Sequence, residues 1–306
     1  MALELKYRPK SLDDVAGNSE TLDLLENAFS RDEDSLKHTI MFSGPKGCGK
    51  TTLARICADM AKCSEVHEYD IGNMGGVDVA REIKVKVPYK PMSGGNLGII
   101  LDEVHEGSSK FFNAMLKTLE EPPKHVFFFL CTTDPQKVLP TVKSRCARYE
   151  VGLLSQKEMV SFLERVSDRE EKENEDLQIL GDTIELIARA SRGTPREALI
   201  MLDQSIGLKP EQQLVFADQA QVKEAQVKEL CQALLKKKKW KYVATIIKGL
   251  KEDPESIRRA VLGYMSAVLL NSGGGQSYVI MDSFREPFFN TGKAGLTLAC
   301  YESIEG

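Results

Sequence analysis

The stretch that decides the fold reads Gly44-Pro45-Lys46-Gly47-Cys48-Gly49-Lys50-Thr51. It fits the pattern G-x-x-x-x-G-K-[ST], in which glycines let backbone N–H groups wrap around phosphates. An apolar run, His38–Ser43, precedes it, and a helical pattern that begins at Thr52 follows it. Because a chance glycine-rich turn lacks this strand–loop–helix context, the sequence predicts a nucleotide-binding loop at the start of a helix.

The residue types in this loop predict separate roles for its side chains and its backbone. Lys50 would place a positive charge at the β- and γ-phosphates, and the Thr51 hydroxyl would ligate Mg²⁺. We expect the remaining contacts of the loop to come from Gly44, Pro45, Lys46, Gly47, Cys48, Gly49 and Thr52. ATP and Mg²⁺ are the cofactors that the loop predicts.

A second apolar run, Leu97–Leu101, ends in the acidic pair Asp102 and Glu103. The carboxyl end of a buried parallel strand is where such sheets bind ligands. Asp102 is therefore predicted to hold Mg²⁺ through its water, and Glu103 to orient and deprotonate the attacking water. We assign no catalytic role to the neighbouring His105.

A third apolar run, Val126–Thr132, is followed by Thr133. The hydroxyl of Thr133 is predicted to touch the γ-phosphate or the attacking water, and Thr132 is the alternative residue for that contact. A non-catalytic interpretation stays open for both, since a hydroxyl at a strand end also serves local hydrogen bonding.

The pattern of elements up to about Val151 predicts an α/β fold. Short β-rich runs alternate with helical patterns, which is typical of a parallel sheet with crossover helices. The expected strands are His38–Ser43, Glu68–Ile71, Leu97–Leu101, Val126–Thr132 and Arg148–Val151. We therefore predict a P-loop domain with a five-stranded parallel sheet over residues 1–152.

Helical patterns dominate the rest of the chain. Ser155 and Glu158 form a capping box before an apolar stripe, and Thr194–Pro195 starts a later helix. We expect a small helical lid over residues 153–207, a polar linker over Leu208–Ala217 and an all-α collar over residues 218–306. The expected collar helices are Val222–Leu235, Lys241–Leu250, Ser256–Leu270 and Gly292–Ser303, with a break at Ser272–Gly275.

Charge and cysteine content argue against several classes of protein. The net charge of −4 is unlike that of a protein that binds nucleic acid over its whole surface, so DNA contact must come from a local patch. Seven cysteines with no C-x-x-C pair argue against a disulfide framework or a four-thiolate zinc site. No apolar run is long enough to cross a membrane, and the first residues show no signal-peptide pattern. We therefore expect a protein of the bacterial cytoplasm, or of an infected host cell, without membrane contact.

Several further motifs closely resemble those of bacterial clamp-loader ATPases, which are AAA+ proteins. They are Phe111–Pro123, Thr132–Lys137 and Ser144–Cys146, together with the opening segments Tyr7–Lys10 and Val15–Asn18. Within that family the chain looks like a short form of the DNA polymerase III gamma/tau subunit, of the kind that a virus of bacteria would encode. The resemblance is dense over residues 5–205 and weak beyond them.

The resemblance implies roles that residue spacing alone does not give. Arg145 would be an arginine finger that reaches the ATP of a neighbouring subunit, and Arg196 would contact the nucleotide's phosphates from the lid. Tyr7, Arg8 and Val15 would lie near the adenine. Without the resemblance, a surface salt bridge is the simpler interpretation of Arg145 and of Arg196. The four-cysteine zinc module of the family is missing here, so no zinc is expected.

The resemblance also implies a function for the chain. It predicts the ATP-driven motor subunit of a loader that opens a sliding clamp and places it on primer–template DNA. The expected partners are the clamp, the DNA through its phosphates, and other loader subunits in a ring or spiral of five. Arg81, Lys84 and Lys86 are candidate DNA contacts, although an ordinary solvated helix face explains them equally well.

Three other functions stay open. A branch-migration helicase or another AAA+ remodeller would need translocating loops and usually a winged-helix end, where this sequence predicts helices. A scaffold subunit that binds partners without hydrolysis would not need the intact ATP site. A P-loop kinase would need neither Arg196 on a separate lid nor the Ser144–Cys146 element.

Overall fold

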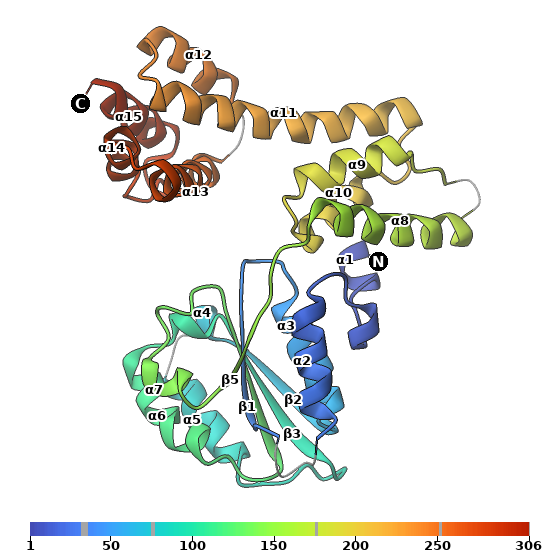
Figure 1. Ribbon diagram of the computed structural model, residues 1–306. Coiled ribbons are helices and arrows are strands. Elements are labelled where there is room, and N and C mark those ends of the chain that lie inside the picture. The colour runs from blue at the N-terminus through green and yellow to red at the C-terminus, as the bar shows by residue number, and fades with distance from the viewer. Residues whose placement is uncertain (32–35, 75–76, 175–176, 251–252, 306) are drawn as a thin grey trace. The chain divides into compact units, whose positions relative to one another are not determined.

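The computed structural model describes residues 1–31, 36–74, 77–174, 177–250 and 253–305. Contacts within the chain divide it into two units, Met1–Pro210 and Glu211–Gly306. Figure 1 shows that the first unit holds a sheet covered by helices together with further helices, and that the second is made of helices.

The first unit is built on a parallel sheet of five strands in the order β2–β3–β4–β1–β5. The strands are β1 (Thr39–Ser43), β2 (Cys63–Asp70), β3 (Asn96–Asp102), β4 (Val126–Thr132) and β5 (Ala147–Glu150). Ile40 of β1 pairs with Phe129 of β4 and with Ala147 of β5, so β1 and β5 begin at nearly the same level. The predicted α/β fold with a five-stranded parallel sheet is confirmed.

Helices cover both faces of this sheet (Figure 1). α2 (Ser19–Phe29) and α3 (Lys50–Met60) lie on one face, and α5 (Val77–Lys86) and α6 (Ser109–Glu120) lie on the other. Short helical turns complete this part of the chain: α1 (Leu3–Lys6), α4 (Ile71–Met74) and α7 (Pro140–Lys143), with 3-10 turns at Leu12–Asp14 and Val104–Glu106.

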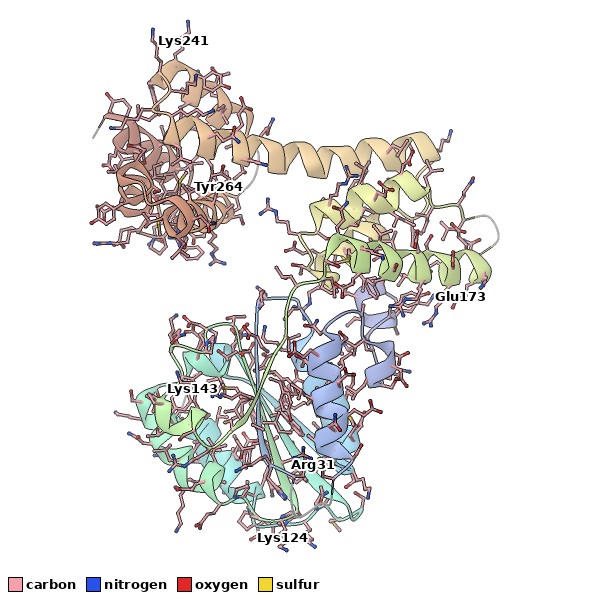
Figure 2. The ribbon with its side chains drawn as sticks, viewed as in Figure 1. Arg31, Lys124, Lys143, Glu173, Lys241 and Tyr264 are labelled. Atoms are coloured by element: carbon pink, nitrogen blue, oxygen red, sulfur yellow. The ribbon has the colours of Figure 1, made fainter. Side chains whose placement is uncertain are left out.

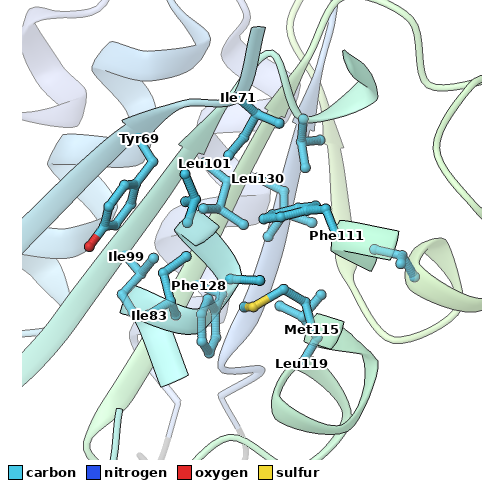
Figure 3. Packing of buried hydrophobic residues seen from close by; sticks show 14 of the residues in the cluster. Tyr69, Ile71, Ile83, Ile99, Leu101, Phe111, Met115, Leu119, Phe128 and Leu130 are labelled. Atoms are coloured by element: carbon cyan, nitrogen blue, oxygen red, sulfur yellow. The ribbon is translucent and has the colours of Figure 1, made fainter. Parts of the chain in front are cut away.

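Side-chain alternation along the central strands produces two cores. On β4, Phe128 and Leu130 belong to the core under α6, whereas Phe127 and Phe129 belong to the core under α3. Figure 3 shows the first of these cores, with the labelled residues Ile99, Leu101, Phe128 and Leu130 of the strands and Phe111, Met115 and Leu119 of α6. Full burial of one such side chain contributes roughly 1.5–3 kcal/mol. The sheet therefore holds its strand ends, and the loops that follow them, in fixed positions.

The start of β2 differs from the prediction. The strand begins at Cys63 rather than at Glu68. It lies at the edge of the sheet, and its residues Ser64, Glu65 and Val66 are exposed. Because polar residues of an edge strand face water, the first half of β2 lacks the apolar run by which buried strands are recognised.

Three further helices belong to the first unit: α8 (Gln156–Glu173), α9 (Gly181–Ala190) and α10 (Pro195–Ser205). The predicted capping box is present, since Glu158 N donates to Ser155 Oγ over 3.3 Å and Ser155 N donates to Glu158 Oε2 over 2.8 Å. Leu154 N donates to the Gly193 carbonyl over 2.9 Å, which ties the chain before α8 to the chain before α10. The domain boundary after residue 152 stays a prediction.

The second unit is all-α, with α11 (Pro210–Leu235), α12 (Trp240–Gly249), α13 (Pro254–Ser272), α14 (Gly275–Ser283) and α15 (Gly292–Glu305). The predicted linker over Leu208–Ala217 is wrong, because α11 begins at Pro210. Proline is tolerated in the first turn of a helix, and most of the residues that follow favour helix. Leu230, Val261 and Phe284 are fully buried in the core of this unit. No helix in the described ranges combines the length and the apolar content that crossing a bilayer requires.

Candidate nucleotide site

The phosphate loop joins the end of β1 to the start of α3. Gly44 and Gly47 have φ angles of +155° and +77°. A Cβ atom at Gly44 would lie 2.0 Å from the carbonyl oxygen of Val151, and one at Gly47 would lie 2.6 Å from Cγ2 of Thr194. Both positions therefore require glycine. The loop ends at the N-terminus of α3, where backbone N–H groups and the helix dipole favour phosphate.

Lys50 is buried in this loop, with 6% of its surface exposed. Its Nζ donates to the carbonyl oxygens of Gly44 over 2.9 Å and of Pro45 over 2.7 Å. It forms no ion pair with a described carboxylate. Because a buried ammonium is costly without a negative partner, this arrangement favours the arrival of an anion.

Thr51 and Asp102 form a candidate magnesium site. Thr51 Oγ1 donates to Asp102 Oδ2 over 2.7 Å, and Glu103 N donates to Asp102 Oδ1 over 3.0 Å. A hydroxyl and a carboxylate oxygen are hard ligands of the kind that Mg²⁺ takes together with phosphate and water. The two residues therefore fit the metal that the sequence predicts.

Glu103 lies directly after Asp102, in the left-handed conformation with φ 46° and ψ 43°. Thr133 Oγ1 donates to Glu103 Oε2 over 3.2 Å. Thr132 Oγ1 is instead 3.1 Å from His105 Nδ1 and accepts from Asp134 N over 3.0 Å. Of the two threonines, the structure thus brings Thr133 and not Thr132 against the predicted base.

His105 is closer to this site than the sequence indicated. Its ring is 8% exposed, with Nδ1 3.4 Å from Glu103 Oε2 and Nε2 3.1 Å from Glu106 Oε1. Its position two residues after Glu103 is the only feature of the sequence that suggests this contact. The 3-10 turn at Val104–Glu106 directs the ring back toward the strand ends, and the sequence does not predict that turn.

A cavity beside the phosphate loop gathers the residues predicted to hold the rest of the nucleotide. Tyr7, Arg8, Val15, Gly47, Cys48, Gly49, Thr52 and Arg196 all line it. Its other lining residues are Glu4, Pro9, Ala16, Leu53, Phe162, Pro195 and Leu199. Sequence reasoning missed Phe162, because its place in the apolar stripe of α8 is equally typical of a core residue. Pro45 and Lys46 are both exposed in the loop.

Comparison with known proteins gives a consistent picture. The family model described as DNA polymerase III, delta subunit matches residues 65–154. The chain is 36% identical over 230 residues to the DNA polymerase III subunit gamma/tau of Mycobacterium tuberculosis, covering 67% of this chain and 38% of that protein. It is 36% identical over 228 residues to subunit tau of Bacillus subtilis and 34% identical over 227 residues to subunit tau of Escherichia coli, covering 67% of this chain in both cases. The chain spans 39% and 34% of the length of these last two relatives.

Solved structures of Thermotoga maritima RuvB share the fold. One mutant form of RuvB aligns with a TM-score of 0.58 and 18% identity, over 90% of this chain and 92% of that one. The RuvB Holliday junction branch migration motor aligns with a TM-score of 0.53 and 23% identity, over 65% of each chain. Such identities show the fold alone.

This chain is a clamp-loader-like protein. The resemblance that its motifs predicted is confirmed.

The clamp-loader-like protein keeps Arg145 away from its own nucleotide site. Arg145 lies in a cleft with His38 and Lys124, near the amino ends of β1 and β4. Figure 2 labels Lys124 at this end of the strands. The phosphate loop follows the carboxyl end of β1, roughly 20 Å away at about 3.3 Å per strand residue. Arg145 Nη2 is 2.8 Å from Glu120 Oε1, and its Nε is buried without a hydrogen-bond partner in the described structure.

The candidate DNA contacts all lie on α5. Arg81 pairs with Asp78 over 2.8 Å, and Lys86 pairs with Glu82 over 3.0 Å. Lys84 is exposed, and the described residues offer it no ion pair. Both interpretations of this helix face therefore stay open, because partners one turn away neutralise two of the three cations.

Proposed function

We propose that this protein is the ATP-driven subunit of a loader that opens a sliding clamp and places it on primer–template DNA. One observation carries the proposal. Residues Lys50, Thr51, Asp102, Glu103 and Thr133 converge at the carboxyl ends of β1, β3 and β4, in a chain two thirds of which aligns with DNA polymerase III gamma/tau subunits. A scaffold that only bound nucleotide would have no use for the base Glu103.

The site geometry supports ATP hydrolysis. On nucleotide binding, Lys50 would exchange its carbonyl partners for phosphate oxygens, which keeps the buried ammonium paired. Mg²⁺, held by Thr51 and Asp102, would neutralise charge on the phosphates. Glu103 would accept the proton of the attacking water at its carboxylate, and the hydrogen bond from Thr133 would set the direction of that carboxylate.

The lid and the N-terminal segment would hold the rest of the nucleotide. Arg196 lies in the first turn of α10 beside the phosphate loop, and a cation there would contact the phosphates. Tyr7, Arg8 and Val15 line the same cavity and would enclose the base. Because both sets of residues would contact ATP, nucleotide binding would fix the lid against the sheet.

Arg145 would complete the ATP site of a neighbouring subunit. Its place at the opposite edge of the sheet from the phosphate loop supports a role in trans. The pair with Glu120 would hold the guanidinium until a neighbour docks. A partly exposed pair of this kind is worth about 0–1 kcal/mol, which is small against the roughly 10³–10⁵-fold rate gain from an arginine finger.

The partners follow from the same proposal. The chain would assemble with other loader subunits, in a ring or spiral of five, through its second unit acting as a collar. It would contact the sliding clamp, and it would hold DNA through phosphates by way of Arg81, Lys84 and Lys86. ATP binding would tighten the assembly, and hydrolysis would release the clamp.

A branch-migration motor is the second candidate, because the RuvB alignment extends over 90% of this chain. Steady-state ATP hydrolysis by the assembled protein separates the candidates. We expect stimulation when a sliding clamp and primer–template DNA are present together. Stimulation by a four-way junction but not by the clamp would replace the proposal with a branch-migration motor. Absence of hydrolysis under every condition would leave a scaffold.

A further inference from the structure

A second, strongly basic cleft lies in the first unit next to the predicted nucleotide cavity, with which it shares Tyr7, Arg8, Pro9 and Phe162. It has a volume of about 540 Å³ and lies between the N-terminal segment and α8. Six cations line it, namely Lys6, Arg8, Lys10, Arg165, Arg169 and Lys172, against two acidic residues, Asp14 and Glu173. The chain as a whole has a net charge of −4, so this excess of positive charge is local.

The sequence of α8 produces one wall of the cleft. Arg165, Arg169 and Lys172 recur at intervals of four and three residues, so they share one face of the helix. At a rise of about 1.5 Å per residue, they form a row with steps of roughly 4–6 Å. Figure 1 shows α1 beside α8, and Figure 2 labels Glu173 at the end of this helix.

The two walls are fixed to each other. Lys6 Nζ donates to Glu170 Oε1 over 2.7 Å and also pairs with Glu173. These contacts raise the pKa of the Lys6 ammonium above its ordinary value, since both carboxylates stabilise its charged form. Lys6 thus acts as a tie between the walls rather than as a free cation of the cleft.

The other cations of the cleft lack such partners. Lys10, Arg165, Arg169 and Lys172 form no side-chain hydrogen bond or ion pair within the described ranges of the chain. Asp14 is the nearby acid, and Ser11 occupies its carboxylate. Ser11 Oγ donates to Asp14 Oδ2 over 2.9 Å, and Ser11 N donates to the same oxygen over 3.2 Å. Cations that converge in this way repel one another, and a ligand with several negative charges relieves that repulsion.

We infer that this cleft binds single-stranded nucleic acid through its phosphates. Guanidinium groups match phosphate oxygens two at a time, so the two arginines of α8 suit a ligand that carries several phosphates. The rings of Tyr7 and Phe162 line the same cleft, and aromatic rings between cations are typical of sites where bases stack. Stacking on an aromatic ring requires an unpaired base, which favours a single strand over a duplex.

The test uses the whole chain with Arg81→Glu and Lys84→Glu already in place, so that binding through α5 is weakened. Fluorescence anisotropy of a labelled oligothymidylate is measured over a range of salt concentrations. Adding Arg169→Glu and Lys172→Glu should weaken binding by about tenfold and make the salt slope shallower by about 1.4, since each phosphate contact on a single strand contributes about 0.7. The matched control is Lys157→Glu with Lys241→Glu, two exposed cations outside the cleft, which changes the net charge equally.

Folding is checked by thermal melting, and Arg169→Gln with Lys172→Gln gives the same test without new negative charge. Loss of affinity in the cleft variants but not in the control supports the inference. Equal losses in cleft and control variants, or no loss in either cleft variant, would overturn it. Competition by polyglutamate as effective as that by unlabelled oligonucleotide would also overturn it in favour of an acidic peptide. ATP hydrolysis is measured on the same proteins, so failure of this inference is distinguishable from failure of the proposed function.

Discussion

Thr133 donates a 3.2 Å hydrogen bond to Glu103, although the two residues are thirty positions apart in the chain. Each stands directly after its strand, Thr133 after β4 and Glu103 after β3, and the two strands are paired in parallel. Because the strand ends are held by the core, the contact gives the carboxylate of Glu103 a fixed direction. The predicted base and the predicted sensor of the γ-phosphate thus form one unit.

Glu103→Gln should keep ATP binding and lower the hydrolysis rate by about 10²–10⁴-fold, the usual contribution of a general base. The amide has the same shape as the carboxylate but takes up no proton. Equilibrium binding of a fluorescent ATP analogue and steady-state phosphate release measure the two effects separately. Hydrolysis at the parent rate would remove Glu103 from the catalytic role.

Thr133→Ala and Thr132→Ala should affect different properties. Thr133→Ala should lower hydrolysis without changing the melting temperature, because this partly exposed hydroxyl contacts the base. Thr132 is completely buried, and its loss leaves Asp134 N and His105 without their partner at a cost of about 1–3 kcal/mol. Thr132→Ala should therefore lower the melting temperature by several degrees. The reverse assignment of effects would make Thr132 the functional residue.

Lys50→Ala should abolish the stabilisation of the protein by ATP. Saturating nucleotide at a hundred times its Kd should stabilise the parent by about 2.7 kcal/mol, seen as a rise in melting temperature. Without ATP, the variant should lose only the stability that the packing of the Lys50 side chain contributes. Removing its buried charge should cost no further stability. Lys157→Ala, which changes an exposed lysine outside the nucleotide cavity, is the control and should keep the shift. An undiminished shift in Lys50→Ala would contradict the phosphate-loop assignment.

The second unit should lose stability in acid through Glu255. Two hydrogen bonds from Arg258 lower the pKa of Glu255 to about 2, helped by donation from Phe288 N over 2.8 Å. A folded pKa below the unfolded one contributes stability that is fully present above about pH 4.3, and that stability is lost as pH falls toward 2. Glu255→Gln should flatten this part of the pH profile.

Trp240 makes this measurement specific, because it is the single tryptophan of the chain and packs against the core of the second unit. Denaturant unfolding followed by its fluorescence, repeated from about pH 6 to about pH 2 across the range in which the carboxyl titrates, gives the profile for the parent and for Glu255→Gln. Parallel profiles would show that Glu255 does not carry the acid sensitivity.

Much of the fold follows from local patterns. β1, β3 and β4 are buried on both faces, so their apolar runs mark them directly, and Ser155 with Glu158 marks the start of α8. The first half of β2 escaped detection because an edge strand exposes polar residues. α14 was missed as well, because Gly275 looked like part of a break rather than the first residue of a helix.

The site could be predicted only as far as its motifs extend. Lys50, Thr51, Asp102 and Glu103 carry chemistry that their spacing reveals. The choice between Thr132 and Thr133 depends on which side of β4 each hydroxyl points to, which a strand end does not show in sequence. Phe162 reaches the cavity beside the phosphate loop from α8, and only tertiary packing brings it there.

Shared ATP sites are the central claim, and hydrolysis by mixed assemblies tests it most directly. Arg145→Ala should leave nucleotide binding by the isolated chain nearly intact, because Arg145 lies at the opposite edge of the sheet from the phosphate loop. The assembled complex should lose roughly 10³-fold or more of its stimulated hydrolysis, while Arg148→Ala, which changes an exposed arginine three residues further on, should lose little.

The decisive measurement is stimulated ATP hydrolysis after Arg145→Ala chains are mixed with Lys50→Ala chains, each of which is inactive alone. Mixing should restore part of the activity, because one kind of interface then pairs an intact phosphate loop with an intact arginine. No recovery in assemblies shown to contain both chains, or full activity of Arg145→Ala alone, would contradict the account.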